Sequence, residues 1–259
     1  MKTRWLTTGI LCFVAVVFFF IGKNNYNRET VTVSQNIEPD IDTILQKNML
    51  PCPQKKTSAI HKLTDYFQLV NINDIDSTIL VDLKYATIDN FTETVLYEDF
   101  EDAYLQPDVA RMLAEAHHYL KKSYPGLRLL VYDAVRPLSV QRTMWNHVKN
   151  TKYHRYIAHP DRLSLHNYGA AVDLTIADSL GHPLDMGTPF DHFGRAAGIN
   201  NENELIEQGL LNNQQVLNRQ MLREVMRHAG FRSISGEWWH FNACSLQEAK
   251  QRYMLVDNF

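Results

Sequence analysis

Two short segments far apart in the chain constrain the fold more than any other feature, because both have to reach one site. The first is Ser-Leu-His-Asn-Tyr-Gly-Ala-Ala-Val-Asp at 164–173, and the second is Glu-Trp-Trp-His at 237–240. They supply two imidazoles, His166 and His240, and the carboxylate of Asp173. Three such ligands leave the fourth position of a tetrahedral Zn²⁺ ion open to water. We therefore predict a single catalytic zinc site per chain.

The spacing within the first segment requires a turn. His166 and Asp173 are seven residues apart, and an odd separation on one regular strand places side chains on opposite faces. Gly169 lies between them and can adopt the positive φ of a tight turn. Asp173 also interrupts the mostly apolar run 170–176, where a buried carboxylate needs a cation or hydrogen-bond donors. We expect both residues to face one metal ion.

Glu237 lies three residues before His240, next to Gly236. A fourth protein ligand would close the zinc site and make it structural. We therefore assign Glu237 as the base that takes a proton from the attacking water. The alternative is a structural zinc site, for which Cys244 is the nearest candidate for a fourth ligand.

A third motif, Asp-Ala-Val-Arg-Pro at 133–137, follows a predicted strand at 127–132. An arginine fixed at a strand end can place its cation on the oxygen of a tetrahedral intermediate. In that arrangement Asp133 would orient Arg136. Taken alone, the motif favours a plain Asp–Arg pair at the surface.

Hydrophobic periodicity indicates an α+β fold, with an antiparallel sheet and helices packed against it. A single domain that contains the zinc site is expected at 61–259, behind an N-terminal hydrophobic segment. The predicted strands are 79–85, 127–132, 170–176 and 238–242, and the predicted helices are 139–148, 214–228 and one that begins at Pro107.

The N-terminus has its own composition. Residues 1–22 start with basic side chains and continue as an uncharged, mostly apolar run, which is typical of a signal peptide or a membrane anchor. Small residues of the kind cleaved by signal peptidase are missing, and this favours an uncleaved anchor. Residues 23–60 are polar and are expected to form a tether. The catalytic domain is then exported and faces the periplasm or the outside of the cytoplasmic membrane.

Charge and cysteine content limit the partners. The net charge of -3 and the lack of Lys/Arg runs interleaved with aromatics argue against nucleic-acid binding. An exported domain permits a disulfide between Cys52 and Cys244, and the alternative is two unpaired thiols. The oligomeric state cannot be deduced from the sequence.

Several segments resemble the D-alanyl-D-alanine dipeptidases, the zinc peptidases of the vancomycin-resistance type. The pattern Ser-x-His-x-x-Gly-x-Ala-x-Asp also marks the related D,D-carboxypeptidases. The doubled Trp before His240 and the run Asp-Leu-Lys-Tyr-Ala-Thr are similar to the dipeptidase branch. The likeness extends from about residue 65 to 245 and rests on the segments 82–91, 133–137, 164–173, 186–191 and 237–241.

The resemblance implies a role for each matching residue. Zinc would be bound by His166, Asp173 and His240. Glu237 would act as general base and then as the acid that protonates the leaving amine, while Arg136 would contact the scissile carbonyl oxygen.

The resemblance also implies a substrate pocket. Asp191 would bind the substrate ammonium group, and Ser164 and Tyr85 would hydrogen-bond the substrate. A preference for D-residues is implied by the resemblance alone.

The predicted reaction is hydrolysis of the small dipeptide D-alanyl-D-alanine to free D-alanine, within cell-wall peptide metabolism. The nearest alternative is a D,D-carboxypeptidase that trims peptidoglycan stem peptides. A second alternative, a non-catalytic wall-binding module on a membrane tether, is disfavoured because the zinc ligands and Glu237 are all present.

Overall fold

The computed structural model describes residues 58–98 and 100–258. The predicted anchor at 1–22, nearly all of the tether at 23–60 and the thiol of Cys52 lie outside this part. The anchor, the domain boundary, the disulfide and the cellular location therefore stay predictions. Within 58–98 and 100–258, no helix is long and apolar enough to cross a bilayer.

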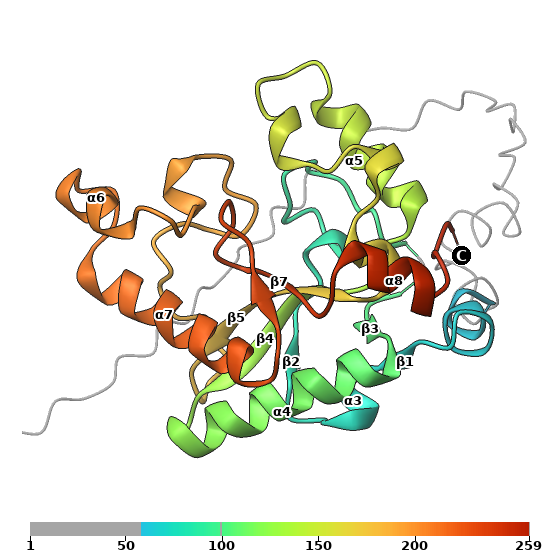
Figure 1. The fold of residues 1–259 in the computed structure, drawn as a ribbon, viewed down its shortest axis with the longest axis horizontal. Coiled ribbons are helices and arrows are strands. Elements are labelled where there is room, and N and C mark those ends of the chain that lie inside the picture. Colours follow the sequence, from blue (N-terminus) through green and yellow to red (C-terminus); the bar gives the residue numbers. More distant parts are fainter. Residues whose placement is uncertain (1–57, 99, 259) are drawn as a thin grey trace, which may run out of the picture. The chain divides into compact units, whose positions relative to one another are not determined.

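A five-stranded sheet with the order β2-β4-β5-β7-β6 lies at the centre (Figure 1). Its strand β2 pairs with β4 in parallel, and the other three pairs are antiparallel. The predicted α+β class is thus confirmed, but the sheet is mixed rather than antiparallel throughout. The strands are β2 (Leu80–Val81), β4 (Arg128–Asp133), β5 (Ala171–Ala177), β6 (Arg232–Ser233) and β7 (His240–Asn242).

The one parallel pair has a topological cause. Parallel neighbours need a crossover connection, and between β2 and β4 the chain runs through the long helix α4 (Pro107–Ser123). Pro107 occupies the first turn of that helix, as predicted. A separate two-stranded antiparallel sheet joins β1 (Val70–Asn71) to β3 (Tyr104–Leu105).

Helices cover one face of the central sheet. In Figure 1, α4 and α7 (Asn213–His228) lie along this face, and they contact each other and the strands. Helix α5 (Leu138–Val148) and the loop after it lie on the opposite side. The other helices are short: α3 (Ile72–Ile75), α6 (Glu202–Glu207), α8 (Leu246–Arg252), the π-turn η1 (Lys62–Tyr66) and the 3-10 turns η2 (Lys84–Ala86), η3 (His154–Tyr156), η4 (Pro160–Arg162), η5 (Leu165–Tyr168) and η6 (Arg195–Ala197).

Two predicted strands are shorter than expected. Of the alternating run 79–85, only Leu80–Val81 pairs with the sheet; the chain then turns at η2. Lys84 stabilises this turn because its Nζ binds the carboxylates of Asp82 and Asp89 at 2.8 and 2.7 Å. Of the run 238–242, only His240–Asn242 forms a strand.

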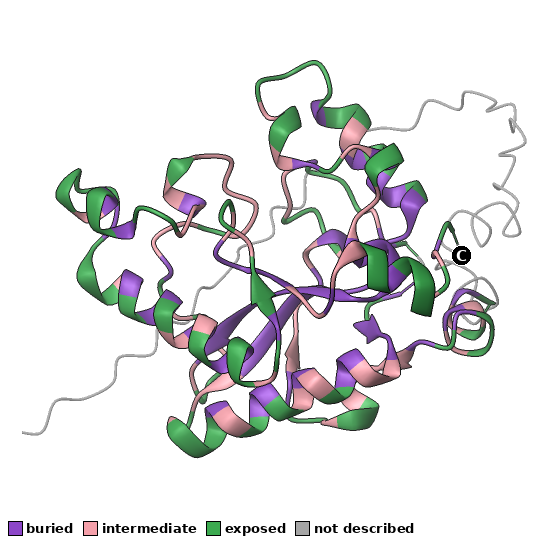
Figure 2. Cartoon of the chain, in the orientation of Figure 1, coloured by how far each residue is buried: buried purple, intermediate pink, exposed green. Residues whose placement is uncertain are grey.

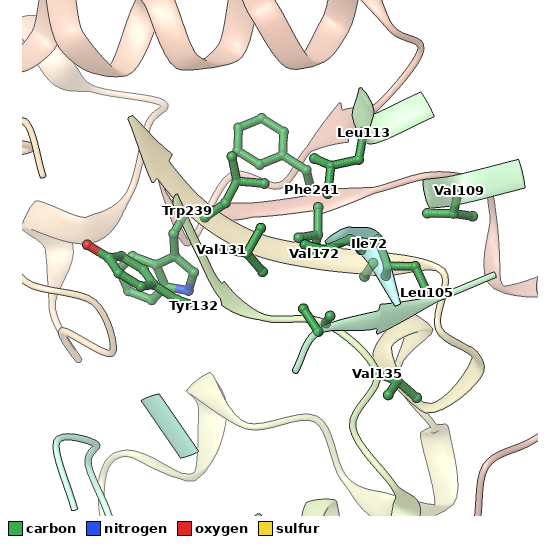
Figure 3. Close-up of a cluster of buried hydrophobic side chains, with 14 of the residues drawn as sticks. Ile72, Leu105, Val109, Leu113, Val131, Tyr132, Val135, Val172, Trp239 and Phe241 are labelled. Carbon is green, nitrogen blue, oxygen red and sulfur yellow. The ribbon is translucent and has the colours of Figure 1, made fainter. Parts of the chain in front are cut away.

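Strand β5 forms the centre of the core, and all seven of its residues are buried (Figure 2). Figure 3 shows Val172 of this strand among Val131, Leu113 and Phe241, which come from β4, α4 and β7. Burial of one such side chain contributes about 1.5 to 3 kcal/mol. The apolar packing thus holds the strands whose ends carry the polar site.

The turn predicted at Gly169 is present. Gly169 has φ +63° and ends η5, while the Ser164 hydroxyl at the other end accepts a hydrogen bond from the His166 N–H. A Cβ on Gly169 would lie 2.8 Å from Leu69 Cδ2 and 3.3 Å from the backbone nitrogen of Gln106. The position therefore requires glycine both for its backbone conformation and for its close approach to the segment before α4.

Replacing Gly169 by alanine is expected to lower the free energy of unfolding by about 2 to 5 kcal/mol, the sum of the left-handed backbone and the overpacking. Gly209→Ala is the matched control, because Gly209 has φ +69° and its added Cβ would meet nothing within 4 Å. That control should lose only about 1 to 2 kcal/mol. Urea unfolding measures both; equal losses would mean that the contact with Leu69 costs nothing.

Candidate metal centre and active site

Strand register brings three polar residues side by side. Asp173 of β5 is paired with His240 of β7 on one side and with Asp133 of β4 on the other. Directly paired residues project their side chains from the same face of a sheet. The register of β4 shifts between Val131 and Asp133, and this irregularity allows Asp133 to join the row. His166 reaches the same place from the η5 turn.

Three donor atoms converge at this point. Asp173 Oδ1 lies 2.9 Å from His240 Nδ1 and 3.3 Å from His166 Nε2, and the two imidazole nitrogens are 3.1 Å apart. A tetrahedral Zn²⁺ ion with ligand bonds of about 2.0 to 2.2 Å separates its ligands by about 3.3 to 3.6 Å. The three residues are buried, and their spacing is close to that of a zinc site.

The hydrogen bonds behind the imidazoles fix their tautomers. His166 Nδ1 lies 2.6 Å from the carbonyl oxygen of Ala134, and His240 Nε2 lies 2.8 Å from Asn242 Oδ1. Both oxygens are acceptors, so these two nitrogens carry the hydrogens. The other nitrogens then direct lone pairs at each other and at Asp173, an arrangement that repels itself unless a cation lies between. Metal-bound histidines have the same kind of supporting partner.

The charge of Asp173 is stabilised from two sides. Burial alone would raise the pKa of this carboxyl, but positive charge on His166 and His240, when these imidazoles are protonated, lowers it far below its ordinary value. The guanidinium of Arg136 lies 3.4 Å from its second oxygen. Asp173 is therefore an ionised ligand.

Glu237 lies beside the three donors without joining them. In the described part of the chain, the metal-binding group contains neither Glu237 nor Cys244. The alternative of a structural zinc site closed by Cys244 is therefore unsupported. Burial raises the pKa of Glu237 to about 7, although His240 opposes the shift. A carboxyl group with a pKa near neutrality can both accept and donate a proton.

Arg136 and Asp133 form a buried pair, not the surface pair that the motif alone favours. Arg136 is 7% exposed and Asp133 is fully buried. Arg136 Nε and Nη2 donate to one carboxylate oxygen at 2.9 and 2.6 Å, and the hydroxyl of Tyr97 donates to the other at 2.6 Å. Burial by itself would lower the pKa of Arg136, but Asp133 raises it well above its usual range. The guanidinium is thus a fixed cation.

Asp191 has the most unusual environment in the site. Its backbone has φ +60°, which is strained for a residue with a Cβ. The Tyr85 hydroxyl donates to its Oδ1 at 3.0 Å, whereas its buried Oδ2 has no hydrogen-bond partner among the described residues. Burial raises the pKa of Asp191 to about 7. A buried carboxylate oxygen without a partner is costly, so it suits a donor brought by a ligand.

These side chains surround one cavity of about 280 Å³. All the site residues predicted from the sequence line it, except Asp133, which lies behind Arg136. Ser164 contributes to the wall while it caps η5. The apolar part of the wall is formed by Tyr156, Ile157, Ala158, Leu163, Leu165, Phe193, Ile234, Trp239 and Leu246.

Comparisons with known proteins identify the family of this chain. Residues 65–258 match the peptidase family described as D-Ala-D-Ala dipeptidase. The chain belongs to this D-Ala-D-Ala dipeptidase family. It is 32% identical over 202 residues to a D-alanyl-D-alanine dipeptidase of Escherichia coli, covering 76% of this chain and 94% of the relative. Membership of the family confirms the resemblance that the motifs indicated and makes the chain a hydrolase of the metallopeptidase type.

One further relative and one solved structure match less of the chain. A D-alanyl-D-alanine dipeptidase of Synechocystis is 31% identical over 169 residues, covering 53% of this chain and 68% of the relative. A solved structure of a mutant of the vancomycin resistance D,D-pentapeptidase VanY, in complex with Zn(II), is 15% identical with a TM-score of 0.31. It covers 57% of this chain and 78% of the solved chain.

No role was predicted for three of the supporting residues, Tyr97, Gln141 and Asn242. Asn242 lies two residues after His240 on β7, and strand periodicity places both on the same face. That signal was sufficient to find it. Tyr97 binds Asp133, and Gln141 accepts a hydrogen bond from Arg136 at 3.2 Å; neither residue has a sequence pattern that points to the site.

Asn242→Ala is expected to weaken binding of Zn²⁺ about 10- to 100-fold, because His240 loses the acceptor that keeps Nδ1 directed at the other ligands. Competition with a chromophoric chelator measures the affinity. Asn213→Ala, at the exposed start of α7, is the control and should bind zinc like the parent. An unchanged affinity in the Asn242 variant would mean that packing alone orients the ring.

Proposed function

We propose that this protein hydrolyses the dipeptide D-alanyl-D-alanine to two molecules of D-alanine, with one Zn²⁺ ion held by His166, Asp173 and His240. Family membership over residues 65–258 supports the reaction. The single observation that carries the mechanism is the convergence of three buried donor atoms within 3.3 Å of one another. Together with Glu237 they border a cavity of small-molecule size.

Glu237 moves the proton in this mechanism. When bound, zinc supplies a Lewis acid that polarises the peptide carbonyl and lowers the pKa of water. The carboxylate of Glu237 accepts a proton from the attacking water as the water oxygen bonds to the carbonyl carbon. The same group then donates that proton to the amine as the C–N bond breaks. A pKa raised to about 7 by burial suits both steps.

Arg136 stabilises the negative charge that develops on the carbonyl oxygen. It lines the cavity, and Asp133 fixes its guanidinium through two hydrogen bonds to one oxygen. The Tyr85 ring packs 5.2 Å from the guanidinium carbon. A cation that is already in position costs no reorganisation during the reaction, and this is the main source of electrostatic catalysis.

Asp191 selects a free amino terminus. Its Oδ2, which has no hydrogen-bond partner in the described part of the chain, accepts a hydrogen bond from the substrate ammonium, one residue from the bond that is cut. The cavity of about 280 Å³ is just below the usual range of about 300 to 1,000 Å³ for small-molecule sites. Both features favour a dipeptide over the stem peptide of a D,D-carboxypeptidase.

Glu237→Gln is expected to keep one zinc ion per chain and a parent-like KM, but to lower kcat about 10²- to 10⁴-fold. The amide cannot accept the proton of water, although it retains the shape of the side chain. Release of D-alanine from D-alanyl-D-alanine measures kcat. Glu207→Gln, at an exposed position in α6, is the control. A parent-like rate in Glu237→Gln would remove this residue from proton transfer.

A side-by-side assay of the dipeptide and a stem pentapeptide tests the substrate. The parent should hydrolyse the dipeptide with the higher kcat/KM. Asp191→Asn should raise KM for the dipeptide about 10- to 100-fold, the worth of a hydrogen bond to a charged group, and change it little for the pentapeptide. A parent that prefers the pentapeptide would establish the carboxypeptidase alternative instead.

A further inference from the structure

Arg219, outside the cavity, is a completely buried arginine. Its guanidinium donates to three backbone carbonyls: Nε to Met186 at 2.6 Å, Nη2 to Ala196 at 2.9 Å and Nη1 to Gly198 at 3.4 Å. Burial lowers its pKa to about 10, so it stays charged at neutral pH. A buried charge is expensive unless its donors are satisfied, and here they bind two separate loops to α7.

The first loop leads to Asp191. Beside Arg219, Asn218 of α7 donates to the carbonyl of Asp185 at 2.8 Å, and Gln215 donates to the Asp185 side chain at 2.9 Å. Residues 215, 218 and 219 share one face of the helix, since they are three and four apart. This face therefore fixes the segment 185–186, which ends five residues before Asp191.

The strained backbone of Asp191 requires that the segment before it be held in place. A non-glycine residue at φ +60° costs of order 1 to 3 kcal/mol and persists only where the surroundings impose it. Asp191 also keeps a buried oxygen without a partner among the described residues. Without a fixed segment before it, the chain could relax both costs and turn the carboxylate away from the cavity.

The second loop, which contains Ala196 and Gly198, is hydrogen-bonded to the turn that carries Glu237. The N–H of Ile199, next to Gly198, donates to the carbonyl of Ser235 at 3.1 Å. The guanidinium carbon of Arg219 also lies 5.9 Å from the ring of Trp238. Trp238 directly follows Glu237, and its indole N–H donates to Thr188 Oγ1 at 2.8 Å. The two loops and the Glu237 turn thus meet around one cation.

We propose that Arg219 is a positioning residue that holds Asp191 and Glu237 in place relative to the metal centre; this rests on the proposed function. The metal ligands have a different support, because Asp173 and His240 are fixed by strand pairing and His166 by the η5 turn. Loss of Arg219 therefore displaces the two acids and leaves the donor triangle intact.

The role requires the planar fork of arginine. Three carbonyls lie around one guanidinium, and a lysine ammonium, a single point on a flexible stem, cannot reach all three. The nearby acid Glu202 is bound by Arg223 through two hydrogen bonds of 2.9 and 2.6 Å, and it is 3.9 Å from Arg219. The backbone carbonyls are therefore the main partners of Arg219.

Arg219→Lys is expected to keep its zinc and to lose about 100-fold in kcat/KM for the dipeptide per zinc-loaded chain. KM should rise through Asp191 and kcat should fall through Glu237. Arg128→Lys is the matched control, since Arg128 donates to the Ser179 carbonyl at 2.7 Å away from the site and should match the parent. If Arg219→Lys lowers only the thermal stability and zinc content, with normal kcat/KM per loaded chain, the proposal is overturned.

A second variant tests the positioning of Asp191 separately from that of Glu237. It also tests the proposal if Arg219→Lys does not fold. Asn218→Ala removes the hydrogen bond to Asp185 and therefore affects only the segment that leads to Asp191. It should raise KM for the dipeptide and leave kcat unchanged. An unchanged KM would overturn the positioning of Asp191 by this face of α7.

A readout without substrate distinguishes this proposal from the proposed function. The Trp238 indole N–H signal in a ¹⁵N NMR spectrum, assigned with Trp238→Phe, reports the bond to Thr188. Arg219→Lys should shift and broaden this signal, whereas Arg128→Lys should not. An unshifted signal overturns the positioning role. A parent that leaves the dipeptide intact overturns the proposed function, and the signal still tests the placement of the loops.

Discussion

Three electron-pair donors face one another at the centre of this molecule, and the rest of the structure is arranged to hold them there. His166, Asp173 and His240 place two nitrogens and an oxygen within 3.3 Å of each other in a buried site. Such a triangle is unfavourable for the protein alone and favourable around a divalent cation. The donors stay together because Asp173 and His240 belong to paired strands and His166 to the η5 turn. These elements are buried by apolar packing. The apolar burial of β5 on both faces thus offsets the electrostatic cost of the site.

The arrangement separates two tasks. Strand pairing holds Asp173 and His240, and the η5 turn holds His166. The loops 185–199 and 234–237 carry Asp191 and Glu237, the acids proposed to meet the substrate. Side chains of α7 bind the first loop at Asp185, Met186 and Ala196, and the Ile199 N–H joins that loop to the Ser235 carbonyl of the second. Chemistry that needs a fixed metal is placed on the sheet. Recognition, which differs between related enzymes, is placed on loops, where a change does not disturb the core.

How far the sequence predicts this structure depends on whether a residue belongs to a local pattern. The ligands, Gly169 and the long helices α4, α5 and α7 follow from spacing and periodicity, and the structure has them. Strand lengths cannot be predicted from the alternating pattern. Tyr85, at the end of the predicted strand 79–85, lies in the turn η2, which Lys84 stabilises. The buried Arg136–Asp133 pair was also not predictable from its motif, since adjacent Asp and Arg are usually exposed. The pair is held by Tyr97, which lies 36 residues before Asp133, and by Gln141 in the following helix α5.

The pattern Ser-x-His-x-x-Gly-x-Ala-x-Asp, which also occurs in D,D-carboxypeptidases, can be explained by the same division. Every fixed position of that pattern lies in η5, the Gly169 turn or β5, or caps η5. These elements build the metal centre, and they contain neither Asp191 nor Glu237. The motif therefore specifies hydrolysis at a metal ion but not the length of the peptide. Under the proposed function, peptide length is selected by the Asp191 carboxylate, which lines the cavity from a backbone position with φ +60°. Arg219 and Asn218, which we propose to position Asp191, would thus belong to the part of the sequence that selects peptide length.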